Sequence, residues 1–193
     1  VRGVAYATFT IIKVTGNSVA EIIQYDNPEV ILLRDGKSFD YPKEKRVISG
    51  KTILESKINL ECDDMFITMS DGAIYAGVGQ TLNYGWQRDN IVEYAESRYS
   101  NRLSAQAMSS LIVDACNDLY NNEPGDDTTV ATVRLRMRRA VNLMFGPPRD
   151  PKDANKMMAL FFAKQGKHIV SGGTTSGITA EYLGKPLETS VDY

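Results

Sequence analysis

Two short acidic motifs constrain the possible fold of this chain most strongly, because each joins an apolar run to a turn. Met69-Ser70-Asp71-Gly72 ends the apolar run of residues 65–69, and Gly125-Asp126-Asp127-Thr128-Thr129 opens the run of residues 128–133. Short apolar runs bounded by Gly and Asp are typical of buried β-strands. We therefore predict that both acidic motifs lie at strand ends, where a neighbouring glycine leaves room for a ligand to approach.

Asp71 and Asp126 are the candidate metal ligands of these motifs. Carboxylate oxygens are the donors that Mg²⁺ and Mn²⁺ prefer, and a sheet that joined the two strand ends would bring two carboxylates together. Taken singly, Asp-Gly and Gly-Asp-Asp are also common turn sequences. The occurrence of both motifs at predicted strand ends favours a metal site over two unrelated turns.

The segment Asp26–Gly36 provides a third motif, and the three together support a family resemblance. Its sequence, DNPEVILLRDG, is similar to the N-P-P-x-x-L-x-R-D-G hairpin of bacterial metal-dependent protein serine/threonine phosphatases. Ser70-Asp71-Gly72 resembles their (S/T)DG motif, and residues 125–129 resemble their closing GDDxT motif. Order and spacing agree over residues 4–136, and the chain most resembles the stage II sporulation protein E branch of the type-2C phosphatases.

The resemblance implies a fold, a reaction and residue roles. The fold would be α+β, with the family's α-β-β-α sandwich, and the reaction would be hydrolysis of phosphoserine or phosphothreonine in a regulatory protein. Two Mn²⁺ or Mg²⁺ ions would activate the attacking water and neutralise the phosphoryl oxygens, so no side chain would act as nucleophile. Asp71 and Asp126 would be metal ligands. Asp127 would orient a metal-bound water or the loop, and Ser70 and Gly72 would complete the first motif structurally.

The family's other Asp-Gly motif, which supplies a carboxylate that bridges two metals, is absent before the strand pattern of residues 4–14. We therefore expect the C-terminal part of a phosphatase domain that lacks its N-terminal strands and is nearly inactive by itself. The alternative is a non-catalytic regulatory or ligand-binding module on a phosphatase-like sheet. An Asp-Gly motif on a strand upstream of Val1 would favour catalysis.

Hydrophobic patterning predicts the elements around the motifs. β-Branched and aromatic runs predict an antiparallel meander over residues 4–14, 19–25 and 29–34. Further strands are predicted over residues 38–41, 53–60, 65–69 and 128–137. Apolar residues at helical spacing predict helices over residues 86–98 and 104–121, the second with Ser104 as its N-cap. Residues 73–83 show no regular spacing of apolar residues and are predicted to form a loop.

The predicted order of strands and helices changes after Arg139, and we place a domain boundary between residues 1–138 and 139–193. For the second part we predict a small β-α-β-α appendage, with strands over residues 141–145 and 168–170 and helices over residues 150–164 and 176–183. Gly172-Gly173-Thr174-Thr175 stands before its last helix, where backbone N–H groups can bind an anion. A tight turn with a hydroxyl N-cap is the alternative, and no lysine follows to complete a phosphate loop.

Composition and charge exclude other classes of protein. A net charge of −2 and a pI near 5.5 give no electrostatic reason to expect a nucleic acid or an anionic membrane as partner. No apolar run approaches the ~20 residues that a membrane span needs. Cys62 and Cys116 have no metal-ligand spacing, and we expect buried free thiols in a cytoplasmic protein. The expected partner is a phosphoprotein substrate, and the sequence leaves open whether the chain forms a dimer.

Overall fold

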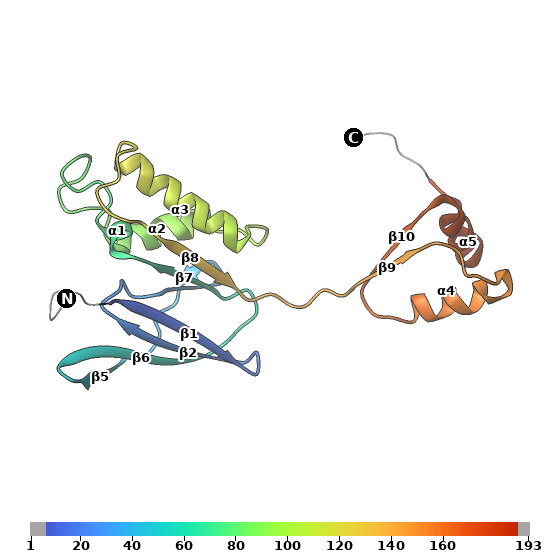
Figure 1. The fold of residues 1–193 in the computed structure, drawn as a ribbon, viewed down its shortest axis with the longest axis horizontal. Coiled ribbons are helices and arrows are strands. Elements are labelled where there is room, and N and C mark those ends of the chain that lie inside the picture. The colour runs from blue at the N-terminus through green and yellow to red at the C-terminus, as the bar shows by residue number, and fades with distance from the viewer. Residues whose placement is uncertain (1–6, 189–193) are drawn as a thin grey trace. The chain divides into compact units, whose positions relative to one another are not determined.

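The computed structural model describes residues 7–188, and the chain divides into two compact units between Met137 and Arg138 (Figure 1). Within the described residues, the first unit has two antiparallel sheets with helices on one side, and the second has a two-stranded parallel sheet with its own helices. No helix of the described part is long and apolar enough to cross a membrane. The predicted α+β class is confirmed.

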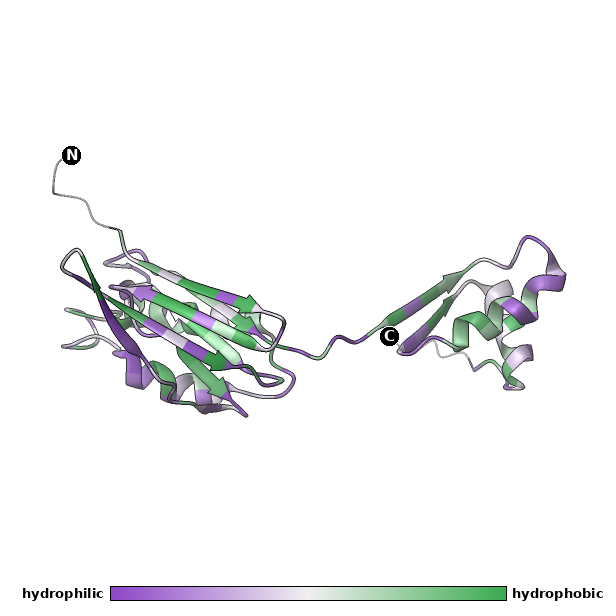
Figure 2. Cartoon of the chain, turned by 90° about the horizontal axis from the view of Figure 1, so that it is seen from below, coloured by the Kyte–Doolittle hydropathy of each residue, from purple (hydrophilic) through white to green (hydrophobic). Residues whose placement is uncertain are grey.

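The first sheet of the first unit has the strand order β1-β2-β6-β5, and every neighbouring pair is antiparallel. Its strands are β1 (Phe9–Thr15), β2 (Val19–Tyr25), β5 (Glu44–Ile48) and β6 (Lys51–Asn59). The β5–β6 hairpin turns at Ser49 and Gly50, whose positive φ values of 51° and 78° suit a two-residue type I′ turn. Apolar and polar residues are interspersed along these strands (Figure 2), because one face of the sheet is packed and the other is open.

The second sheet carries the acidic motifs and has the order β4-β3-β7-β8, again antiparallel throughout. Its strands are β3 (Ile31–Arg34), β4 (Lys37–Ser38), β7 (Met65–Met69) and β8 (Val130–Arg134). Helices α1 (Asp71–Ile74), α2 (Arg88–Arg98) and α3 (Ala105–Leu119) lie against it, and the first sheet lies on its opposite side (Figure 1). The second sheet is therefore the middle layer.

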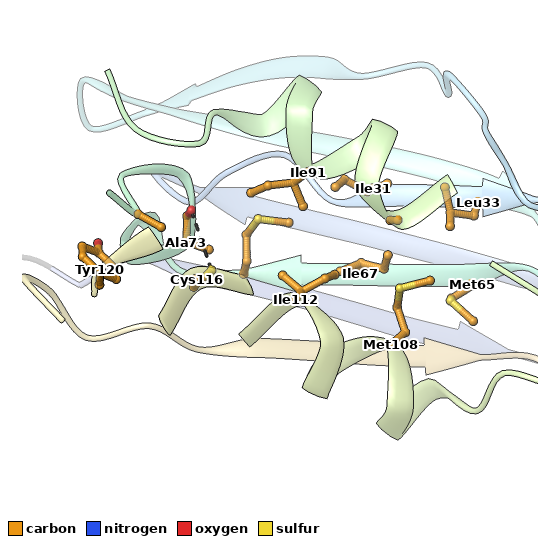
Figure 3. Close-up of a cluster of buried hydrophobic side chains, with 13 residues drawn as sticks. Ile31, Leu33, Met65, Ile67, Ala73, Ile91, Met108, Ile112, Cys116 and Tyr120 are labelled. Atoms are coloured by element: carbon orange, nitrogen blue, oxygen red, sulfur yellow. Dashed lines mark hydrogen bonds between the residues drawn. The ribbon is translucent and has the colours of Figure 1, made fainter. Parts of the chain in front are cut away.

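Strand alternation divides the core of the first unit into two clusters. Odd-numbered residues of β7, such as Met65 and Ile67, pack against α2 and α3 (Figure 3), whereas Phe66 packs between the two sheets. Helix α3 contributes Met108 and Ile112 from the face that its helical spacing predicts. Its predicted N-cap is confirmed, because the Ser104 hydroxyl oxygen accepts a hydrogen bond from the Ala107 N–H at 3.0 Å.

The second unit is a β-α-β-α segment with its own small core. Strands β9 (Val141–Phe145) and β10 (Lys167–Ser171) pair in parallel, joined through the 3₁₀ turn Pro151–Asp153 and α4 (Ala154–Phe162). Helix α5 (Gly173–Leu183) follows β10. The buried core consists of Met144, Met158 and Phe161.

Several local predictions need correction. The predicted third strand of the meander pairs with β4 and β7 in the other sheet, not with β2. The predicted loop over residues 73–83 begins inside helix α1. Strand β5 escaped prediction because all of its residues are exposed and carry no apolar period. Cys116 is buried as expected, but Cys62 is exposed in the turn before β7. Residues 4–6 of the first predicted strand lie outside the described residues.

Candidate metal centre

The β7–β8 ladder brings the two acidic motifs side by side. Met69 pairs with Val130 at the last position of the ladder, so the chain leaves β7 where it enters β8. The pairing continues one step further, because the Ser70 N–H donates to the Thr129 carbonyl at 3.0 Å. Asp71 then opens helix α1, and Asp126 lies in the loop before β8.

The Ser70 side chain ties the two motifs together. Its hydroxyl oxygen accepts from the Thr129 N–H at 2.9 Å, and its O–H donates to the Asp127 carbonyl at 3.0 Å. Both bonds join residues that are almost sixty positions apart in the sequence. A single hydroxyl group therefore sets the spacing of the two turns.

Gly72 is required by the close approach of these turns. A β-carbon at this position would lie 2.6 Å from the Asp127 carbonyl oxygen and 2.8 Å from the Thr128 Oγ1. Both separations are shorter than a carbon–oxygen contact allows, so any other residue would push the turns apart. The glycine of the first motif therefore makes room for the second motif.

Tyr120 is a third link between the motifs, and one that the sequence did not predict. It follows the last turn of α3, is 3% exposed, and its O–H donates to the Gly72 carbonyl at 2.9 Å. Burial, followed by the negative charges of Asp126 and Asp71, raises the pKa of Tyr120, so that the hydroxyl keeps its proton and donates. Its helical spacing from Ile112 and Cys116 predicts burial but not a polar partner.

The carboxylates of Asp71 and Asp126 each use one oxygen locally. Asp71 Oδ1 accepts from the Gly72 N–H at 3.1 Å, and Asp126 Oδ1 accepts from the Asp127 N–H at 2.8 Å. Within residues 7–188, no Lys, Arg or His forms an ion pair with these carboxylates or with Asp127. A carboxylate without a positive side-chain partner is available to a divalent cation.

The donor set fits part of a hard-cation site. Oxygen donors are what Mg²⁺ and Mn²⁺ require, and Asp71 and Asp126 provide them from the ends of neighbouring strands. In the part of the chain that the structure describes, no group of three or more His, Cys, Asp or Glu side chains is arranged to hold a metal ion. The described residues therefore do not form a complete ligand cage for a metal ion.

A cavity of about 360 Å³ adjoins the motifs. It is lined by hydroxyl, amide and apolar side chains from both sheets, namely Thr8, Phe9, Thr10, Asn27, Thr68, Met69, Ser70 and Thr129. The amide of Asn27 donates to Thr10 Oγ1 at 3.2 Å, so the segment Asp26–Gly36 also reaches this cavity. Small-molecule sites commonly begin at roughly 300 Å³, so the cavity has room for a small polar ligand.

The predicted anion loop lies in the other unit, but the helix begins earlier than predicted, because only Gly172 precedes α5 and residues 173–175 form its first turn. Gly172 is the N-cap with a φ of 99°, and no side chain caps the helix by a hydrogen bond. Thr175 is buried, and the Ser176 N–H donates to the Gly172 carbonyl at 2.9 Å, which closes the first helical turn. Anion binding by Gly172, Gly173, Thr174 and Thr175 stays a prediction.

Comparisons with known proteins establish the family of the chain and the fold of its first part. A family model described as stage II sporulation protein E (SpoIIE) matches residues 2–136. The fold is similar to two crystal structures of the phosphatase domain of the cell fate determinant SpoIIE from Bacillus subtilis, one of them presoaked with Mn. For the Mn-presoaked structure, the TM-score is 0.56 and the identity 15%, over 70% of this chain and 59% of that chain.

The second structure of that domain gives a TM-score of 0.56 and an identity of 16%, over 70% of this chain and 61% of that chain. At such identities the likeness establishes the fold alone. This chain spans about three fifths of the length of those domains. The search of curated proteins returned no match.

Proposed function

The chain belongs to the stage II sporulation protein E family, as its motifs predicted, and from this premise we propose that it is part of a metal-dependent protein serine/threonine phosphatase. The observation that carries the proposal is the meeting of the two turns that contain Asp71 and Asp126 beside the joined ends of β7 and β8, with no cationic side chain paired to either carboxylate in the described residues. The proposed substrate is a phosphoserine or phosphothreonine of a regulatory protein in the cytoplasm.

In this proposal Asp71 and Asp126 hold divalent cations, Mn²⁺ or Mg²⁺, through their carboxylate oxygens. Two such ions, when bound, would supply an activated water and charge neutralisation to phosphoryl transfer. Ser70 and Gly72 hold the two turns at the required spacing, through the two hydrogen bonds of Ser70 and the missing side chain of Gly72. Asp127 contributes its backbone carbonyl to that spacing, and its carboxylate lies beside that of Asp126 in the sequence, where it can orient water.

We further propose that residues 1–138 are the C-terminal part of a phosphatase domain and that residues 139–193 form an appended α/β unit. A dinuclear centre needs more ligands than the two carboxylates proposed here, and the described residues contain no group of three or more His, Cys, Asp or Glu that could hold a metal ion. The remaining ligands would come from polypeptide outside this chain. Residues 1–193 alone should therefore bind metal weakly and show almost no turnover.

The test of the metal assignment is Mn²⁺ binding to the chain, measured from the electron paramagnetic resonance signal of free Mn²⁺. Asp71→Asn and Asp126→Asn keep the side-chain shape but remove a charge, and each should weaken binding at least about tenfold. Asp114→Asn is the matched control, since Asp114 lies on the exposed face of α3 and should bind Mn²⁺ as the unchanged chain does. Wild-type affinity in both Asp71 and Asp126 variants would contradict the assignment.

The test of the reaction uses the complete protein. It should hydrolyse an aryl phosphate when Mn²⁺ is added and lose that activity when a chelator removes the metal. A non-catalytic binding module predicts no turnover under either condition. Full Mn²⁺-dependent turnover by residues 1–193 alone would show that the site has been assigned to the wrong residues.

A further inference from the structure

The end of helix α3 is attached to the backbone of the Asp71 turn. The Tyr120 O–H donates to the Gly72 carbonyl at 2.9 Å, and one helical turn earlier the Cys116 Sγ lies 4.0 Å from the Ala73 carbonyl oxygen. Figure 3 shows Cys116 directed at Ala73, with Tyr120 at the same end of the buried cluster. Two successive carbonyls of the metal-site turn therefore face side chains of one helix end.

Tyr120 also lies close to the second motif. A β-carbon placed on Gly125 would lie 3.6 Å from the Tyr120 Cε1, so the edge of the ring lies next to the space beside Gly125. The loop between them is closed by the Glu123 N–H, which donates to the Tyr120 carbonyl at 2.9 Å. One side chain therefore bonds to the first motif with its hydroxyl group and has its ring edge close to the second motif.

The first motif needs such support because α1 is very short. It comprises only Asp71–Ile74, and the Ser70 N-cap makes no side-chain hydrogen bond to it. A single helical turn does not persist by its own hydrogen bonds, because fixing the first turn costs more conformational entropy than one bond returns. The orientation of the Asp71 carboxylate therefore depends on what holds this turn from outside.

From these contacts we propose that Tyr120 is a positioning residue for the metal centre, and that its hydroxyl group sets the orientation of the Asp71 turn relative to Asp126. The inference rests on the proposed function and adds a residue to it. A cation is bound more tightly when its carboxylates are held in place beforehand, since less ordering remains to be done on binding. Removal of the hydroxyl group should therefore weaken metal binding, although Tyr120 touches no metal.

A matched control exists elsewhere in the same unit. Tyr41 is also 3% exposed, and its O–H donates to a backbone carbonyl, that of Val30, at 2.7 Å. It belongs to the cluster between the two sheets, whereas Tyr120 belongs to the cluster beneath the helices. Tyr41→Phe and Tyr120→Phe remove the same group from the same kind of bond, so both should cost similar stability.

The experiment measures Mn²⁺ affinity and unfolding in urea for the unchanged chain, Tyr120→Phe, Tyr41→Phe and Asp71→Asn. We expect Tyr120→Phe to raise the Mn²⁺ dissociation constant about tenfold, and Tyr41→Phe to leave it unchanged at a similar loss of stability. Hydrogen exchange at the Tyr75 amide, which donates to the Asp71 carbonyl, should accelerate about tenfold in Tyr120→Phe and not in Tyr41→Phe. The exchange readout needs no metal.

The outcomes separate the two proposals. If Asp71→Asn weakens binding but Tyr120→Phe binds and exchanges like the unchanged chain, the metal site stands and the role of Tyr120 is wrong. If both tyrosine variants weaken Mn²⁺ binding equally, Tyr120 acts only through overall stability, and the inference is again overturned. If Asp71→Asn binds Mn²⁺ like the unchanged chain, or the unchanged chain binds none, the proposed function is wrong and the inference falls with it.

Discussion

Gly72→Ala tests the close approach on which the candidate site depends. The new β-carbon would lie 2.6 Å from the Asp127 carbonyl oxygen, a backbone atom that already accepts a hydrogen bond from Ser70. The conflict cannot be relieved by rotation of a flexible side chain, so the turns must separate. Overpacking of this kind costs about 1–3 kcal/mol, and a clash with a backbone atom belongs to the upper part of that range, about 2–3 kcal/mol. Because Gly72 lies in helix α1, where alanine is favoured by roughly 1 kcal/mol, we expect a net loss of about 1–2 kcal/mol.

The assay is urea unfolding followed by tryptophan fluorescence. Trp86 is the single tryptophan of the chain and packs against the core of the first unit, so its emission reports that unit alone. With a slope of about 2 kcal/mol per molar urea, a loss of about 1–2 kcal/mol lowers the midpoint by roughly 0.5–1 M. Under the proposed metal assignment, Mn²⁺ affinity should also fall in this variant, because the turns that carry Asp71 and Asp126 move apart.

Gly125→Ala is the control for this prediction. It lies in the second motif, but a β-carbon there would meet its nearest neighbour, the Tyr120 Cε1, at an ordinary 3.6 Å. We expect a change in the free energy of unfolding within about 0.5 kcal/mol. If Gly72→Ala were as stable as Gly125→Ala and bound Mn²⁺ equally well, the argument from close approach would be refuted.

Two further predictions concern buried groups of the same unit. Asp64 is fully buried, and its carboxylate accepts hydrogen bonds from the Arg34 guanidinium at 2.8 and 2.9 Å and from the Glu61 N–H at 2.8 Å. Asp64→Asn should therefore lower the free energy of unfolding by about 3 kcal/mol. Wild-type stability of this variant would show that the Arg34–Asp64 ion pair contributes little. Burial raises the pKa of Cys116 to about 11, whereas Cys62 is exposed. Because the thiolate is the reactive form, a thiol reagent at pH 8 should modify only Cys62 in the native chain and both cysteines after unfolding. Rapid modification of both cysteines in the native chain would contradict the burial of Cys116.

The sequence alone determined the elements that carry the candidate site. Strand β7 ends at Met69 where its apolar run ends, and α3 begins after Ser104, because burial period and cap chemistry are local properties of the chain. The three motifs likewise indicated the family, since their order and spacing are read directly from the residues.

Only the tertiary structure decided how these elements meet. The transfer of β3 to the second sheet depends on pairing with β7, more than thirty residues away, and no local pattern encodes that choice. Strand β5 forms because β6 offers it an edge, although its own residues are all exposed. The bond from Tyr120 to Gly72 crosses 48 positions of sequence. Helical period predicts that a tyrosine is buried, but its hydrogen-bond partner exists only once the chain has brought a distant carbonyl within 3 Å, at the usual hydrogen-bond length.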